Sequence, residues 1–215
     1  MIIAIDGPAG SGKGTVAKIL ANKLGYLYID TGSMYRSLTY LVLRDNIDTN
    51  SEIDIYNAFK NNDIEITPDS KNLLNGEDIS SKIRTEEINI NVAKVAGYPT
   101  VRELMREKQR DFASKYNIVM EGRDITTEVF PDADYKFYLD ASIDERVRRR
   151  VKQNEEKGLE SNYEEIYESI KNRDTSDMTR EYGALKRTTE QIYIDSSNMT
   201  IDEVVEYMME VIKWI

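Results

Sequence analysis

The chain of 215 residues contains no cysteine and no histidine. Their absence excludes disulfide bonds, thiolate nucleophiles, imidazole general bases and zinc sites built from these residues. The chain also lacks an excess of positive charge, because 39 acidic residues outnumber 29 basic ones and leave a net charge of −10. A broad nucleic-acid-binding surface is therefore not expected. Any chemistry must use carboxylates, lysine, arginine, hydroxyls and backbone amides.

Long apolar runs are missing as well. The opening MIIAID has a five-residue apolar start without a basic flank, which is too short for a signal peptide. No later apolar run approaches the ~18 residues of a membrane span. Hydrophobic residues nevertheless make up 40% of the chain, which excludes a disordered protein. We expect a cytoplasmic monomer with no membrane or nucleic-acid partner.

The order of the apolar segments predicts a parallel sheet with helices on its faces. The chain opens with an apolar run, a glycine-rich turn and a helical apolar stripe that ends at Gly25. A second strand and a helix through Tyr35 and Val42 complete a βαβα start. Five core strands separated by helices predict a doubly wound α/β fold with a five-stranded parallel sheet. The predicted strands span residues 2–5, 26–30, 117–121, 135–141 and 191–195.

A small insertion interrupts this pattern at about residues 61–83. The pieces DIEIT, NLL and EDIS are separated by turn-forming residues such as Pro68, Asn75 and Gly76, and they predict short antiparallel strands. Helical character returns with EEININVAKVAG and again after Pro99, a residue type common at helix starts. We therefore expect a single domain over residues 1–215 that carries an antiparallel insertion.

The segment GPAGSGKGT fits the phosphate-binding-loop pattern of Gly, four residues, Gly and Lys, with Gly14 at the usual hydroxyl position. Its glycines let backbone amides turn inward around a phosphate, and Lys13 adds a charge that can follow the β- and γ-phosphates. A GTPase is disfavoured because no glycine follows an Asp by three residues. The loop predicts triphosphate binding by Gly7, Pro8, Ala9, Gly10, Ser11, Gly12, Lys13, Gly14 and Thr15.

Four further motifs follow the loop in order: DTGSMYR, KVAGYPTVRE, EGRDITTEVFPDADYKFYLDAS and NRDTSDMTR. With the loop and the insertion, they resemble the bacterial-type cytidylate kinases, nucleoside monophosphate kinases of the P-loop class, over nearly the whole chain. The resemblance implies phosphorylation of CMP and dCMP by ATP with Mg²⁺, a monophosphate-binding insertion and a mobile lid. Two alternatives remain open: a kinase for UMP, dTMP or AMP, and a nucleotide-binding regulatory module without transfer activity.

The resemblance also implies roles for individual residues. Arg123 is a phosphate clamp between donor and acceptor, and Asp124 holds neighbouring arginines or the hydrated metal, for which Thr15 is the candidate protein ligand. The implied catalytic set is Lys13, Arg36, Arg123 and Asp124. The implied CMP-binding set is Thr31, Tyr35, Arg36, Arg102, Arg123, Arg173, Asp177 and Arg180.

The residues alone also allow simpler interpretations. The polar residues at 30–33 are ordinary helix-capping residues. Arg102, Arg106 and Arg110 recur at four-residue spacing, and a solvated helix face accounts for the last two. The residues at 173, 177 and 180 fall on one helical stripe, where a surface ion pair is the simplest explanation.

The predicted lid, at about residues 144–187, holds 11 basic and 11 acidic residues and is therefore neutral, while the remainder carries the whole net charge. The three arginines at 148–150 cannot all point one way on a helix, whereas Arg146 and Arg150 share a face and are the predicted ATP contacts. Two positions depart from the family pattern. Ala93 replaces a serine near the base, and Thr126 replaces a glycine, with an expected effect on loop geometry but on no charged group.

Overall fold

The computed structural model describes residues 1–156 and 158–213. It forms two compact units, which we call the loop unit (Met1–Tyr26 and Val119–Ile215) and the insertion unit (Leu27–Ile118). The predicted lid includes Lys157, and the predicted domain includes Trp214 and Ile215; these three positions lie outside the described residues.

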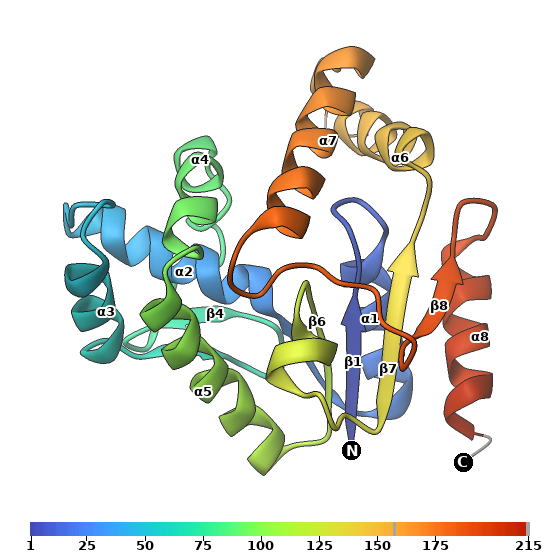
Figure 1. The fold of residues 1–215 in the computed structure, drawn as a ribbon, viewed down its shortest axis with the longest axis horizontal. Coiled ribbons are helices and arrows are strands. Elements are labelled where there is room, and N and C mark those ends of the chain that lie inside the picture. Colours follow the sequence, from blue (N-terminus) through green and yellow to red (C-terminus); the bar gives the residue numbers. More distant parts are fainter. Residues whose placement is uncertain (157, 214–215) are drawn as a thin grey trace. The chain divides into compact units, whose positions relative to one another are not determined.

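The predicted five-stranded sheet is confirmed, with the strand order β2-β6-β1-β7-β8 (Figure 1). β1 pairs with β7, and β7 with β8, in parallel. The strands are near-continuous apolar runs, as expected for a parallel sheet covered on both faces; Ile3 and Ile5 of β1 have no exposed surface. Each predicted strand differs from the observed one by a single residue at one or both ends. The strands are β1 (Ile2–Asp6), β2 (Leu27–Asp30), β6 (Ile118–Gly122), β7 (Tyr135–Asp140) and β8 (Ile192–Asp195).

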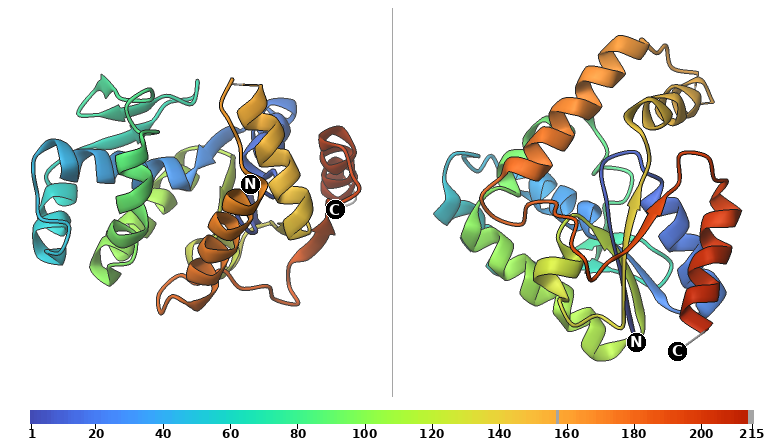
Figure 2. Two further views of the ribbon diagram at one scale, coloured as in Figure 1. Left: turned by 90° about the horizontal axis from the view of Figure 1, so that it is seen from above. Right: turned by 45° about the vertical axis from the view of Figure 1, so that its right-hand side comes forward.

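The helices of the loop unit form two pairs, one beyond the strand ends and one alongside the sheet. α6 and α7 pack against each other beyond the carboxyl ends of these strands, while α1 packs against the amphipathic α8 (Figures 1 and 2). A short π-helix follows β6 and has no counterpart in the sequence prediction. The bounds are α1 (Lys13–Leu24), η1 (Ile125–Val129), α6 (Ile143–Glu155), α7 (Tyr163–Thr179) and α8 (Ile201–Lys213).

The insertion unit contains the predicted antiparallel strands, which form a separate sheet in the order β3-β4-β5. Its register places Ile64 opposite Leu74 and Leu73 opposite Asp78. Helix α3 is absent from the sequence prediction, although Ser51 caps it and Phe59 is fully buried. The elements are β3 (Ile64–Ile66), β4 (Asn72–Leu74), β5 (Glu77–Asp78), α2 (Thr31–Arg44), α3 (Glu52–Lys60), α4 (Glu86–Val95) and α5 (Pro99–Lys115).

No helix within the described part of the chain combines the length and the apolar character needed to cross a bilayer.

Candidate functional site

The loop between β1 and α1 has a backbone that depends on glycine. Gly10 and Gly12 have φ angles of 79° and 91°, which side-chain-bearing residues rarely adopt. A Cβ on Gly7 would lie 2.0 Å from the carbonyl oxygen of Leu139. Gly12 is also the N-cap of α1, and no side chain caps this helix. The loop therefore presents the amide end of α1 to an anion.

Lys13, the first residue of α1, is buried and folded back onto the loop. Its Nζ donates to the carbonyl oxygen of Pro8 at 2.8 Å and to Oγ of Ser11 at 3.4 Å. Burial, together with the nearby charge of Arg123, lowers the pKa of Lys13 to about 7. A bound polyphosphate would favour the charged form, so the buried lysine is suited to an anionic ligand.

Arg123 stands directly after β6 and pairs with a carboxylate of α7. Its Nε donates to Oδ2 of Asp177 at 2.7 Å, and Nη2 of Arg180 lies 3.2 Å from Oδ1 of the same carboxylate. Burial opposes ionisation of Asp177, but the two arginine charges together hold its pKa below the usual value. The structure thus brings three predicted residues together. Arg173 is exposed on α7, whereas Arg180 follows the helix in an extended conformation.

The two predicted lid arginines lie in different surroundings. Arg146 is buried, and its Nη1 donates to the carbonyl oxygen of Ala9 at 2.9 Å and to Oδ2 of Asp174 at 2.6 Å. Arg150 is exposed and donates to Gln153 of its own helix. Of the predicted pair, Arg146 contacts the loop, whereas Arg150 bonds within its own helix.

Two contacts of the phosphate loop were missed by the sequence analysis. Arg149 donates to the carbonyl oxygen of Ser11 at 3.2 Å and to that of Ser196 at 2.6 Å. Its position three residues after Arg146 is a helical-face signal that could have identified it. Asp174 accepts from the amide of Ala9 at 3.3 Å. Nothing in the sequence distinguishes this aspartate from the other acidic residues of the segment.

The expectation that Thr126 affects no charged group is wrong. Its Oγ1 donates to Oδ2 of Asp6 at 2.6 Å, and its amide donates to the same oxygen at 2.8 Å. Asp6 has no exposed surface, and burial raises its pKa to about 6 despite these hydrogen bonds. The sequence alone could not reveal this contact, because 120 residues separate Asp6 from Thr126.

The insertion unit holds a second group of predicted residues, on α2 and α5. Nη2 of Arg36 pairs with Oδ2 of Asp30 at 2.9 Å, and Nη2 of Arg84 lies 3.6 Å from the same oxygen. Arg102 is 2% exposed, and its guanidinium lies over the ring of Tyr35, 5.4 Å from the centroid. Arg84 is an additional cation that the sequence analysis did not select.

The remaining predicted residues of this unit are placed as follows. Asp30 is the N-cap of α2 and accepts from the amide of Ser33, so Thr31, which is buried, is the first residue of the helix. Arg110 is exposed, as a solvated face requires, whereas Arg106 is half-buried. Ala93 is exposed on α4.

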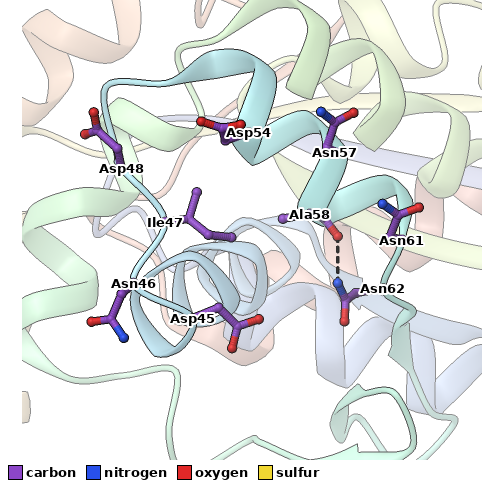
Figure 3. A pocket seen from close by; sticks show the side chains of 9 residues that line it. All are labelled: Asp45, Asn46, Ile47, Asp48, Asp54, Asn57, Ala58, Asn61 and Asn62. Atoms are coloured by element: carbon purple, nitrogen blue, oxygen red, sulfur yellow. Dashed lines mark hydrogen bonds between the residues drawn. The ribbon is translucent and has the colours of Figure 1, made fainter.

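A pocket of about 500 Å³ in the insertion unit does not involve these residues (Figure 3). It is lined by the end of α2, the following turn and α3, including Asp45, Asp48 and Asp54. Each of these carboxylates accepts a hydrogen bond from a neighbouring side chain or amide. Its negative lining is unsuited to phosphate, so we do not assign it to the site.

Comparisons with known proteins agree with these features. A protein-family model described as cytidylate kinase matches residues 3–214. The cytidylate kinase of Geobacillus sp. (strain WCH70) is 44% identical over 213 residues, covering 98% of this chain and 95% of that protein. That of Caldanaerobacter subterraneus subsp. tengcongensis is 47% identical over 211 residues, covering 98% and 94%. A solved shikimate kinase from Bacteroides thetaiotaomicron has a TM-score of 0.51 at 17% identity, covering 99% and 98%; this likeness concerns the fold alone.

Proposed function

The chain belongs to the cytidylate kinase family, and we propose that it transfers the γ-phosphoryl group of ATP to CMP and dCMP. The products are ADP and CDP or dCDP. The observation that carries the proposal is the glycine-dependent phosphate loop with its buried Lys13, held in the same unit as Arg123 and the arginines of α6.

The proposed acceptor explains how the reaction proceeds in a chain without histidine. A phosphate monoester has its second pKa near ~6, so CMP is largely a dianion at neutral pH and needs no strong general base. Catalysis then consists of aligning the two phosphates and neutralising their charge. Lysine and arginine side chains supply both effects.

On the donor side, we assign the triphosphate to the amides of residues 7–15 and to Lys13. Arg146 and Arg149 hold the loop through its carbonyl oxygens and supply positive charge beside it. Arg150, the other predicted ATP contact of the lid, is exposed on α6, and we keep it in the proposed donor site. Closure of this lid would exclude water, which otherwise competes with CMP for the γ-phosphoryl group.

On the acceptor side, we assign the monophosphate to Arg36, Arg123 and Arg180. These guanidiniums pair with Asp30 or Asp177. A phosphate oxygen can replace a carboxylate oxygen in such a pair with little change in geometry. The remaining members of the proposed CMP-binding set are Thr31, Tyr35, Arg102, Arg173 and Asp177.

Mg²⁺ accompanies ATP in the proposed reaction. Among residues 1–156 and 158–213, no cluster of three or more acidic side chains is arranged to hold a metal. Mg²⁺ bound to nucleotide phosphates keeps several waters and needs few protein ligands. Thr15, an exposed residue near the start of α1, is the proposed protein ligand, and the buried Asp124 would hold neighbouring arginines or the hydrated metal. When bound, the metal neutralises charge on the β- and γ-phosphates.

An acceptor panel tests the proposed function. Purified protein is incubated with ATP, Mg²⁺ and either CMP, dCMP, UMP, dTMP or AMP, and ADP formation is coupled to NADH oxidation. We expect the highest kcat/KM with CMP and dCMP. A preference for UMP, dTMP or AMP would assign the chain to another monophosphate kinase. ATP binding without ADP formation from any acceptor would indicate a regulatory module. We further propose that the protein acts as a cytoplasmic monomer.

A further inference from the structure

We propose that Asp6 is a positioning residue for phosphoryl transfer, which fixes the turn carrying Arg123 to the strand that leads into the phosphate loop. The inference rests on the proposed function. Asp6 is the last residue of β1 and directly precedes Gly7. It lies outside the set of residues predicted from the sequence.

Both carboxylate oxygens of Asp6 are used by one short segment. Oδ1 accepts from the amide of Ile125 at 2.9 Å, and Oδ2 accepts from the amide and the hydroxyl of Thr126 at 2.8 and 2.6 Å. This segment begins two residues after Arg123. The buried contact between Asp6 and residues 125–126 therefore joins the segment that follows Arg123 to the strand that precedes the phosphate loop.

The segment needs an acceptor from elsewhere in the molecule. Ile125 and Thr126 are the first residues of η1, whose N-cap, Asp124, makes no side-chain capping bond. The first amides of a helix have no partner within it, so Asp6 acts as a cap supplied by a different strand. π-helical turns are uncommon and occur often at functional sites.

A third segment joins the contact through the hydroxyl of Thr126. Nε2 of Gln191 donates to Oγ1 of Thr126 at 2.5 Å, while Oε1 of Gln191 accepts from the amide of Thr188 at 2.7 Å. Gln191 is buried and directly precedes β8. The hydroxyl thus accepts from one segment and donates to Asp6, so a chain of polar contacts links the residues before β8 to the end of β1.

Burying a carboxylate costs free energy, because burial disfavours its charged form. The other residues of β1 are apolar, and Ile3, Ala4 and Ile5 have no exposed surface. A carboxylate at this position instead fixes direction, since its two oxygens accept from consecutive amides. A displacement of Arg123 by a fraction of an ångström would reduce turnover, because phosphoryl transfer depends on alignment.

The test compares Asp6→Asn and Thr126→Val with Thr126→Ser, which keeps the hydroxyl. We measure kcat, the KM values for ATP and CMP, and the ATP dissociation constant by calorimetry. Asp6→Asn should lower kcat roughly tenfold to a hundredfold and Thr126→Val severalfold. Thr126→Ser should retain most of the wild-type kcat, because the hydroxyl that donates to Asp6 remains. ATP affinity should change by no more than about threefold, because Lys13 and the loop amides remain.

Val205→Ala is the control for a general loss of stability, because it removes apolar volume from the buried side of α8. It should lower the melting temperature without lowering kcat at a temperature where the variant stays folded. If Asp6→Asn does not fold, the comparison of Thr126→Val with Thr126→Ser decides.

The possible results separate this inference from the proposed function. If the wild type makes no CDP, both fail. If the wild type is active but a folded Asp6→Asn variant, or Thr126→Val, keeps the wild-type kcat, the inference alone fails. A fall in ATP affinity that matches the fall in kcat/KM would also overturn it, because Asp6 would then shape the donor site rather than position Arg123.

Discussion

The two units hold their arginines in different ways. In the loop unit, Arg146 donates to two carbonyl oxygens and to the buried Asp174. In the insertion unit, Arg36 and Arg84 share the carboxylate of Asp30, and the side chain of Arg84 is 66% exposed. A buried pair is costly to break, whereas an exposed pair contributes little to stability. The contact of Arg146 with Asp174 is therefore costly to break, whereas the contact of Arg84 with Asp30 contributes little and can be exchanged for a phosphate.

The largest effect should come from Arg123, which already pairs with a carboxylate and would exchange it for phosphate. Arg123→Ala should lower kcat about a thousandfold, because transition-state charge loses a preorganised donor. The melting temperature should change little by comparison. Steady-state kinetics and calorimetry measure the two effects, with the 70%-exposed Arg148 replaced by Ala as the control. Near-normal turnover of Arg123→Ala would remove it from the catalytic set.

Arg149 tests whether ATP binding depends on the hydrogen bonds between α6 and the phosphate loop. Arg149→Ala removes the hydrogen bonds to Ser11 and Ser196 and should raise the KM for ATP about tenfold, with a smaller effect on the KM for CMP. Arg148→Ala, one position away on the same helix, should leave both constants unchanged. Equal effects of the two substitutions would mean that net charge, and not the contact with the loop, determines ATP binding.

Lys13 links pH to stability in the loop unit. Burial lowers its pKa to about 7 in the folded protein, from 10.5. Between these values the unfolded chain binds a proton that the folded protein lacks, so the free energy of unfolding rises with pH. Lys13→Met should remove this rise, which is at most about 1.4 kcal/mol per pH unit. Urea unfolding between about pH 7 and pH 9 measures it; identical slopes in both proteins would contradict the assignment.

The smallest effect should come from Arg84 in the insertion unit. Arg36→Ala should raise the KM for CMP about tenfold, whereas Arg84→Ala, at the more exposed side chain, should raise it by about threefold or less. Initial rates at saturating ATP measure both constants. If Arg84→Ala has the larger effect, the exposed arginine is the principal phosphate ligand of this unit, and the comparison of the two arginines is reversed.

Much of the fold is predictable because the five core strands are apolar runs that end at turn or capping residues. The antiparallel insertion is predictable from its short strands and its turn residues. Two elements are not. The helix Glu52–Lys60 is short, which weakens its periodic pattern. The turn Ile125–Val129 depends on an acceptor supplied by Asp6, so its own residues do not predict it.

The candidate site is predictable where a motif fixes the chemistry, as for Lys13 in the phosphate loop. It is not predictable where packing decides which member of a set makes the contact. The phase of α6 directs Arg149 to the loop and leaves Arg150 exposed, although both belong to the same run of arginines. Asp174 and Asp6 were missed because their partners lie far away in the sequence.

Transfer of a labelled phosphoryl group tests the central claim most directly. Purified protein is mixed with ATP that carries ³²P in the γ-phosphate, Mg²⁺ and CMP, and the labelled products are separated by chromatography. We expect the label to appear in the β-phosphate of CDP, with little released as inorganic phosphate. Labelled inorganic phosphate as the main product, or label that stays in ATP despite measurable ATP binding, would contradict the account.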